Sequence, residues 1–157
     1  MNTSKSLWGQ LPLADVTRTP IIILRQQATI LTELTNGLLE GVVTNRTTGE
    51  THGVEYTSRG EVEKEFNAIL SISAPALDGY TFRILRVDYD LDLYPVTVSN
   101  LVSKSFYAIN LDRTTCDDEK EFLTAVSTIL TSDEVREVIG KLWAQSKSVT
   151  PEESNFI

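Results

Sequence analysis

Cysteine and histidine are nearly absent from this chain of 157 residues, which contains one of each. The single cysteine, Cys116, excludes an internal disulfide and a zinc site built from several cysteines. The single histidine, His52, excludes a metal centre with two or three histidine ligands within one chain. A chain with so few thiols fits a reducing compartment, and we therefore expect a cytoplasmic protein.

Long apolar runs are also missing. The longest purely aliphatic run covers residues 21–24, whereas a membrane-spanning helix needs about 20 consecutive apolar residues. The first residues contain Lys5 but no apolar stretch of the kind that forms the centre of a secretory signal. We therefore expect no membrane partner.

Positive charge is scarce, because 14 Lys and Arg residues stand against 22 Asp and Glu residues, giving a net charge of -8. This balance argues against a general nucleic-acid binder, which needs clustered basic side chains to neutralise phosphates. The glycines are dispersed and form no nucleotide-binding loop, so no cofactor is predicted. The negative charge is unevenly distributed: residues 1–60 carry five acidic and five basic side chains, whereas residues 117–157 carry nine acidic and four basic ones.

The length of the chain and its 41% of hydrophobic residues are sufficient for one hydrophobic core. We expect an irregular N-terminal arm over residues 1–18, which Leu7 and Trp8 could anchor to the body. A single domain is predicted over residues 19–147, followed by a flexible tail over residues 148–157. The order of elements is one helix, a run of strands and two helices. Because the strands are grouped, this order predicts an α+β fold with an antiparallel meander of about five or six strands.

Helix boundaries are marked by capping residues. Thr19 followed by Pro20 is typical of a helix start, and Asn36-Gly37 is typical of a left-handed stop, so a helix is predicted over residues 20–36. Two C-terminal helices, over about residues 117–130 and 133–147, follow capping-box sequences at residues 114–118 and 131–134.

Strands are predicted from β-rich composition and alternation. One segment is ambiguous, because residues 61–70 have a helix-forming composition. Its apolar side chains nevertheless alternate with polar ones over residues 61–73, which favours a strand. The six candidate strands cover residues 38–45, 51–56, 61–73, 80–89, 93–98 and 104–110.

His52 and Cys116 are candidates for nucleophilic or acid–base catalysis, but neither stands in a recognisable catalytic motif. His52 is expected to be an exposed residue of a hairpin. Cys116 is expected in the first turn of a helix, as a small half-buried residue, although a helix N-terminus can lower the pKa of a thiol. The chain also lacks a G-x-S-x-G sequence, so the sequence favours a protein without enzymatic activity.

A hairpin between residues 61–73 and 80–92 brings acidic side chains together. Pairing Ser73 with Tyr80 places the apolar side chains on one face and puts Arg83 among them. The opposite face then carries three directly opposed pairs of carboxylates, which repel each other and therefore call for an explanation. The pairs are Glu65 with Asp88, Glu63 with Asp90, and Glu61 with Asp92.

These six carboxylates are the candidate functional residues. The favoured hypothesis is a small acidic interaction domain, of the inhibitor, immunity, adaptor or accessory-subunit type, that presents them to a basic protein partner. The same carboxylates could instead form a solvated face with no function, or serve a divalent-metal-dependent hydrolase or phosphotransferase. A small-molecule-binding domain with its pocket between the first helix and the sheet is the third function considered. The oligomeric state is left open.

Overall fold

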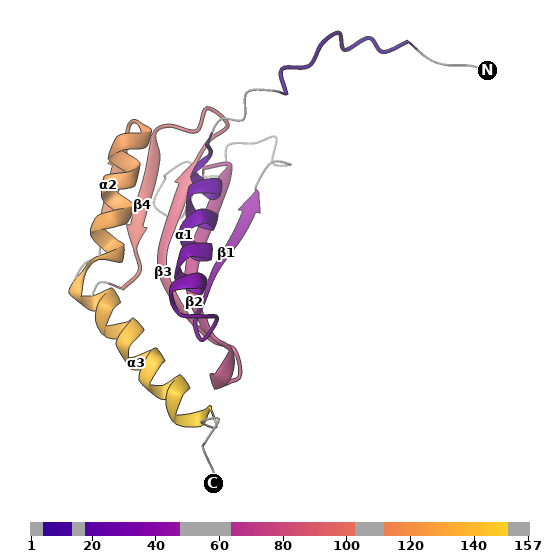
Figure 1. Cartoon of the computed structure of the whole chain (residues 1–157). Helices are drawn as coiled ribbons and strands as arrows, with labels where there is room; N and C mark the ends of the chain where they lie inside the picture. The colour runs from indigo at the N-terminus through magenta and orange to yellow at the C-terminus, as the bar shows by residue number, and fades with distance from the viewer. Residues whose placement is uncertain (1–4, 14–17, 48–63, 103–111, 151–157) are drawn as a thin grey trace.

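The computed structural model of the chain describes residues 5–13, 18–47, 64–102 and 112–150. In these ranges the chain forms helix α1 (Pro20–Leu34), a five-stranded antiparallel sheet, and helices α2 (Glu119–Leu130) and α3 (Asp133–Val149) (Figure 1). The strands lie side by side in the order in which they occur along the chain. This meander confirms the predicted α+β fold, in which the strands are grouped and do not alternate with helices.

Four of the described strands overlap predicted segments, and of these only Tyr80–Tyr89 has the predicted bounds. The strand predicted over residues 93–98 begins at Val96 and ends at Asn100. Phe66–Ala74 confirms the strand predicted over residues 61–73, so the helical alternative is wrong for residues 66–70. The strands predicted at residues 51–56 and 104–110 lie outside the described residues. The sheet consists of β1 (Glu40–Thr47), β2 (Phe66–Ala74), β3 (Tyr80–Tyr89), β4 (Val96–Asn100) and β5 (Arg113–Cys116), with a short 3₁₀ helix, η1 (Pro75–Leu77), between β2 and β3.

Strand β5 was not predicted, because its threonines were assigned to a capping box. Thr114 and Thr115 instead pair with β4, which suits their β-branched side chains. Helix α2 begins only at Glu119, where the Asp118 carboxylate accepts a hydrogen bond from the Glu121 N–H (2.8 Å). The Glu121 carboxylate in turn accepts one from the Asp117 N–H (2.7 Å), so the capping box exists but lies closer to the helix than expected.

Helix α1 begins as predicted and ends two residues earlier. The Thr19 hydroxyl accepts a hydrogen bond from the Ile22 N–H (3.2 Å), and Pro20 occupies the first helical position. Thr35 is the C-cap, and Asn36 and Gly37 follow in the left-handed region with φ of 49° and 79°. Asn36 and Gly37 therefore end the helix as predicted, because they adopt the left-handed conformation that terminates a helix.

Helix α3 begins at the predicted position and extends further than expected. The Ser132 hydroxyl caps it by accepting a hydrogen bond from the Val135 N–H (3.3 Å). The helix continues to Val149, so the first two residues of the predicted tail 148–157 are helical. Residues 151–157 lie outside the described residues. Within the described ranges, no helix combines the length and the apolar character that crossing a membrane requires.

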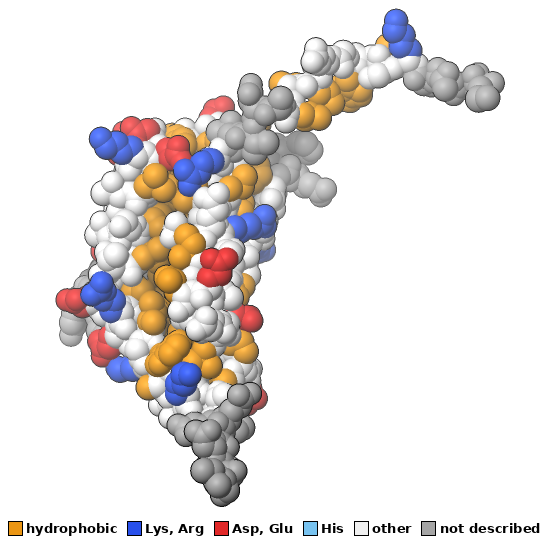
Figure 2. Space-filling view, in the orientation of Figure 1, with side chains coloured by type: hydrophobic (Ala, Val, Ile, Leu, Met, Phe, Trp, Pro, Cys, Tyr) orange, Lys and Arg blue, Asp and Glu red, His pale blue; other side chains and the backbone are white. Residues whose placement is uncertain are grey.

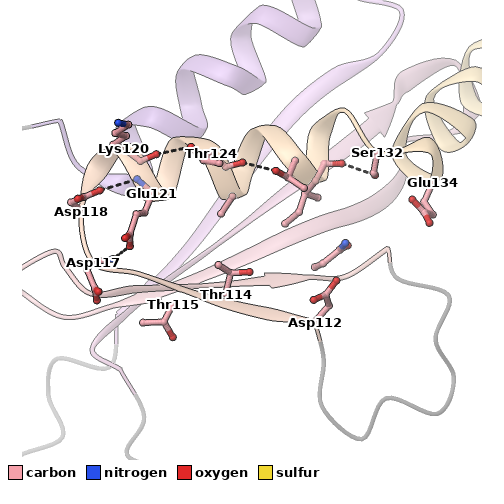
Figure 3. A pocket seen from close by; sticks show the side chains of 14 residues that line it. Asp112, Thr114, Thr115, Asp117, Asp118, Lys120, Glu121, Thr124, Ser132 and Glu134 are labelled. Carbon is pink, nitrogen blue, oxygen red and sulfur yellow. Dashed lines mark hydrogen bonds between the residues drawn. The ribbon is translucent and has the colours of Figure 1, made fainter.

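All three helices cover the same face of the sheet (Figures 1 and 3). The core between them and the sheet contains side chains that are almost completely buried, among them Ile23, Leu24, Leu85, Val87, Val98 and Phe122. The face of the sheet that points away from the helices carries mostly polar side chains, because alternate residues of a strand point to opposite faces.

Helix α1 lies directly on β1, and a glycine allows this close approach. A Cβ atom added at Gly41 would collide with the Cα and carbonyl oxygen of Ala28 in α1. The Thr32 hydroxyl also accepts a hydrogen bond from the Gly41 N–H (3.0 Å). Backbone therefore meets backbone at this point of the α1–β1 contact. The small-molecule pocket considered between the first helix and the sheet stays a prediction.

We expect Gly41→Ala to lower the free energy of unfolding by about 1–3 kcal/mol, because the added methyl group must push α1 away from β1. Urea titration followed by circular dichroism measures this change. Gly140→Ala is the matched control, since a Cβ atom at this position in α3 meets nothing within 4 Å and should stabilise the helix by about 0.5–1 kcal/mol. Equal stability of the two variants would contradict the close packing of α1 on β1.

Candidate functional site

The structure describes four of the six predicted site residues and does not place them in opposed pairs. Glu61 and Glu63 lie outside the described residues, as does His52. Asp88 lies opposite Asn67, not opposite Glu65 as predicted. Glu65 precedes β2, and Asp92 follows β3, so neither belongs to the ladder of the two strands.

The predicted register is wrong for two reasons. Pairing begins with Ala74 opposite Tyr80, one residue away from the predicted pair of Ser73 and Tyr80. A bulge then inserts Ile84, because Leu70 pairs with Leu85 whereas Ser71 pairs with Arg83. Beyond the bulge each β2 residue therefore faces a β3 residue two positions further along than predicted.

A shift of two residues leaves the faces of the sheet unchanged. The structure therefore confirms that Phe66, Ala68 and Val87 share one face, although their predicted pairing is wrong. The bulge changes the position of Arg83, which was predicted among the apolar side chains. Arg83 pairs with Ser71 and so lies on the face away from the helices, which it shares with Arg86.

Two of the predicted carboxylates bind basic side chains. The Arg86 guanidinium donates from Nη2 and Nε to the Asp88 carboxylate, at 2.9 and 3.1 Å. The Asp90 carboxylate accepts from Lys64 Nζ (3.2 Å) and from the Glu65 N–H (3.1 Å). Their charge is thus balanced locally, and within the described ranges no three His, Cys, Asp or Glu side chains are grouped so that they could hold a metal ion.

A different acidic site lies between helix α2 and strand β5. It is a groove of about 980 Å³, open along one side of the helix (Figure 3). Five of its lining residues are acidic and one is a lysine, and none of the five was among the predicted site residues. The charged lining residues are Asp112, Asp117, Asp118, Lys120, Glu121 and Glu134.

The carboxylates stand at the two ends of the groove (Figure 3). Asp117, Asp118 and Glu121 gather at the start of α2, whereas Asp112 and Glu134 lie at the opposite end. The acids at the start of α2 are favoured by the positive end of the helix dipole. No such local reason applies to Asp112, which precedes β5.

Hydroxyl groups line the middle of the groove and present oxygen atoms as hydrogen-bond acceptors. The Thr124 hydroxyl donates to the Lys120 carbonyl (3.0 Å), and the Thr128 hydroxyl donates to the Thr124 carbonyl (2.8 Å). Since each hydroxyl has a single proton, only its lone pairs remain for a ligand. Carboxylates at both ends and acceptor hydroxyls between them make a surface that favours ligands rich in N–H donors.

Strand β5 is the outermost strand on this side of the described sheet. The Asn100 N–H donates to the Asp112 carbonyl (2.9 Å), and in an antiparallel ladder such bonded pairs alternate with non-bonded ones. Thr115, paired with Thr97, therefore directs its backbone N–H and carbonyl away from β4. The groove thus lies along a strand edge that carries backbone donors and acceptors.

The thiol of Cys116 lies at the end of β5 and is buried. Cys116 pairs with Val96, and its side chain is completely buried, so the expected half-buried position in a helical turn is wrong. Burial raises the pKa of the thiol, and the nearby Glu121, Asp117 and Asp118 carboxylates raise it further. Burial and the charge of Glu119 likewise raise the pKa of the neighbouring Tyr94 phenol.

Comparison of the chain with protein-family models, with curated proteins and with solved structures found no match. The interpretation of the site therefore rests on its geometry and charge.

We expect the Cys116 thiol to react at least about 100-fold more slowly with a disulfide reagent at pH 8.5 than a free cysteine does, because burial and a raised pKa both reduce the accessible thiolate. Absorbance kinetics with Ellman's reagent measure the rate. In urea above the unfolding transition, the rate should rise to that of the free amino acid. A native rate equal to the unfolded one would show that the thiol is accessible.

Proposed function

We propose that this protein is a non-enzymatic interaction domain that binds an extended, basic segment of another protein in the groove between α2 and β5. The observation that carries the proposal is the excess of five carboxylates over one lysine in a groove that follows a strand edge. A ligand with alternating basic side chains would satisfy the carboxylates. Its backbone could at the same time pair with the edge of β5.

The proposal keeps the class of partner that the sequence favoured and changes the location of the site. The hairpin pairs Asp88 with Arg86 and carries Arg83 on the same face, so that face is less acidic than its sequence suggests. The groove, in contrast, contains Asp112 and Glu134 at the end away from the start of α2, in addition to the three acidic residues at the start of α2. We therefore assign recognition of the partner to the groove.

Binding by strand addition explains why an extended ligand suits this groove better than a globular surface. The backbone of Thr115 presents one donor and one acceptor toward the outside of the sheet, and an added strand can satisfy both. The carboxylates flanking this edge then select for basic side chains. With a net charge of -8, the protein would also attract such a partner over a distance, an effect that salt weakens.

We expect a short fluorescent peptide of alternating lysine and valine to bind, with a dissociation constant that rises with ionic strength. The combined substitutions Asp112→Asn, Asp117→Asn and Glu134→Gln should weaken binding at least about tenfold, or about 1.4 kcal/mol, because they remove three charges from the groove. Fluorescence anisotropy measures the affinity. The capping residues Asp118 and Glu121 are left intact, so that α2 keeps its start.

The matched control is Glu33→Gln, Glu40→Gln and Asp78→Asn, which removes the same charge from exposed positions outside the groove. It should leave the affinity within about twofold of the unsubstituted protein at 150 mM salt, because charges beyond a Debye length of about 8 Å are screened. Equal losses in the two variants would show that net charge alone attracts the peptide. Equal binding of a peptide with glutamate in place of lysine would likewise reject the groove as a basic-segment site.

A further inference from the structure

Two apolar surfaces of the described chain define no particular occupant. Leu7 is 97% exposed and Trp8 80%, so these residues do not anchor the N-terminal arm to the body as expected from the sequence. Figure 2 shows a second such surface, a band of apolar side chains along the boundary between α1 and α3. Because apolar contact has no preferred direction, neither surface specifies a ligand. The groove between α2 and β5 is different, because carboxylates, hydroxyl groups and backbone polar groups have fixed positions along it.

Neighbouring residues of β5 face opposite sides of the sheet. Thr114 pairs with the buried Val98 and points toward α2, whereas Thr115 points to the other side (Figure 3). The backbone N–H and carbonyl that face away from β4 belong to Thr115, because bonded and non-bonded pairs alternate along the ladder. The residue that offers its backbone at the edge is therefore not the residue whose side chain faces the groove.

A strand added to this edge in antiparallel orientation has the same alternation. Its residue opposite Thr115 exchanges two hydrogen bonds with Thr115, and the side chain of that residue lies on the face away from the helices. The two neighbouring residues point their side chains toward α2 and direct their own N–H and carbonyl groups away from β5. Antiparallel orientation continues the described sheet, in which all neighbouring strands are antiparallel, and it is slightly more stable per residue than parallel pairing.

We propose that the segment bound in this groove carries two basic side chains four residues apart, both facing α2. The first and third of the three residues between them form the backbone hydrogen bonds with β5. This pattern rests on the proposed function, because it describes the same partner in the same groove. It adds which positions of the partner are basic and which ones bond to the strand edge.

The spacing follows from the positions of the carboxylates along β5. Asp112 precedes the strand at one end of the groove, whereas Asp118 and Glu121 gather at the other end. Burial and these two carboxylates raise the pKa of the Cys116 thiol, which places that end of the groove beside Cys116. Residues 112 and 116 of an extended strand are about 13 Å apart at 3.3 Å per residue, and two ligand side chains four residues apart span the same length. Each capping carboxylate keeps lone pairs for a further donor.

The three positions between the basic residues follow from the two sides of β5. The middle residue lies opposite Thr114 and faces the Thr124 and Thr128 hydroxyls, which accept hydrogen bonds, so a side chain with an N–H donor suits it. The first and third residues face the other side of the sheet, where Arg113 lies with Thr115. A basic side chain on that side would approach a like charge, so these two positions are expected to be non-basic.

Two fluorescent peptides of identical composition and charge test the spacing against the full chain. The first is Val-Lys-Val-Gln-Val-Lys-Val, with its lysines four residues apart on one face. The second is Val-Lys-Val-Gln-Lys-Val-Val, with its lysines three residues apart on opposite faces. We expect the first to bind at least about fivefold more tightly, or about 1 kcal/mol, in fluorescence anisotropy at low salt. Equal affinities, or tighter binding of the second peptide, would overturn the proposed pattern.

Backbone N-methylation of the first peptide locates its hydrogen bonds. Methylating the two valine nitrogens between the lysines removes the donors directed at β5 and should weaken binding at least about tenfold, or about 1.4 kcal/mol. Methylating the two lysine nitrogens, which point away from β5, is the matched control and should leave the affinity within about twofold. The reverse result, or equal losses in the two peptides, would overturn the assignment of the bonding residues.

The alternating lysine and valine peptide separates the failure of this pattern from the failure of the proposed function. If that peptide binds and the combined groove substitutions weaken it, while the two isomeric peptides bind equally, the groove is a basic-segment site without the proposed spacing. If the alternating peptide does not bind, both the proposed function and the pattern are wrong.

Discussion

One extra residue in β3, Ile84, determines how the central hairpin distributes its side chains. On one side of the bulge Leu85 and Val87 point into the core beneath the helices; on the other side Arg83 points away from them. A regular ladder would place residues 83, 85 and 87 on one face. Either the arginine would then be buried without a partner or the valine would face water. The bulge removes this conflict, as an inserted residue in an antiparallel pair commonly does.

Much of the fold could be predicted because its signals are local. Thr19-Pro20, Asn36-Gly37 and Ser132 mark helix ends through hydrogen bonds to backbone only a few residues away. The alternation over β2 identified the correct faces for the same reason, since it depends on one strand at a time. Which β2 residue pairs with which β3 residue depends instead on the turn between the strands and on the bulge. A 3₁₀ segment with Asp78 in the left-handed region (φ 56°) sets that turn, and the predicted register did not include it.

The groove could not be predicted from patterns within single segments of the sequence. Asp112 and Glu134 line the same groove although they are 22 positions apart in the sequence, because Asp112 precedes β5 and Glu134 follows α2 in the first turn of α3. The excess of acidic residues after position 117 was a usable signal. It was attributed to helix starts, which fits both Asp118, the N-cap of α2, and Glu134 in the first turn of α3. Asp112 precedes β5 and has no such explanation. Strand β5 was missed because two threonines before an acidic pair fit a capping box as well as a strand.

Asp112 and Asp117, which border β5, also affect whether the edge of β5 can pair with a second copy of itself. Two copies of β5 placed edge to edge in antiparallel fashion would bring Asp112 of one copy toward Asp117 of the other, since these residues border the strand at its two ends. Like charges directly opposed across a new ladder oppose its formation. The carboxylates that we propose to bind a basic strand would thus also oppose pairing of this edge with the same edge of a second copy, which is the aggregation hazard of an open strand edge.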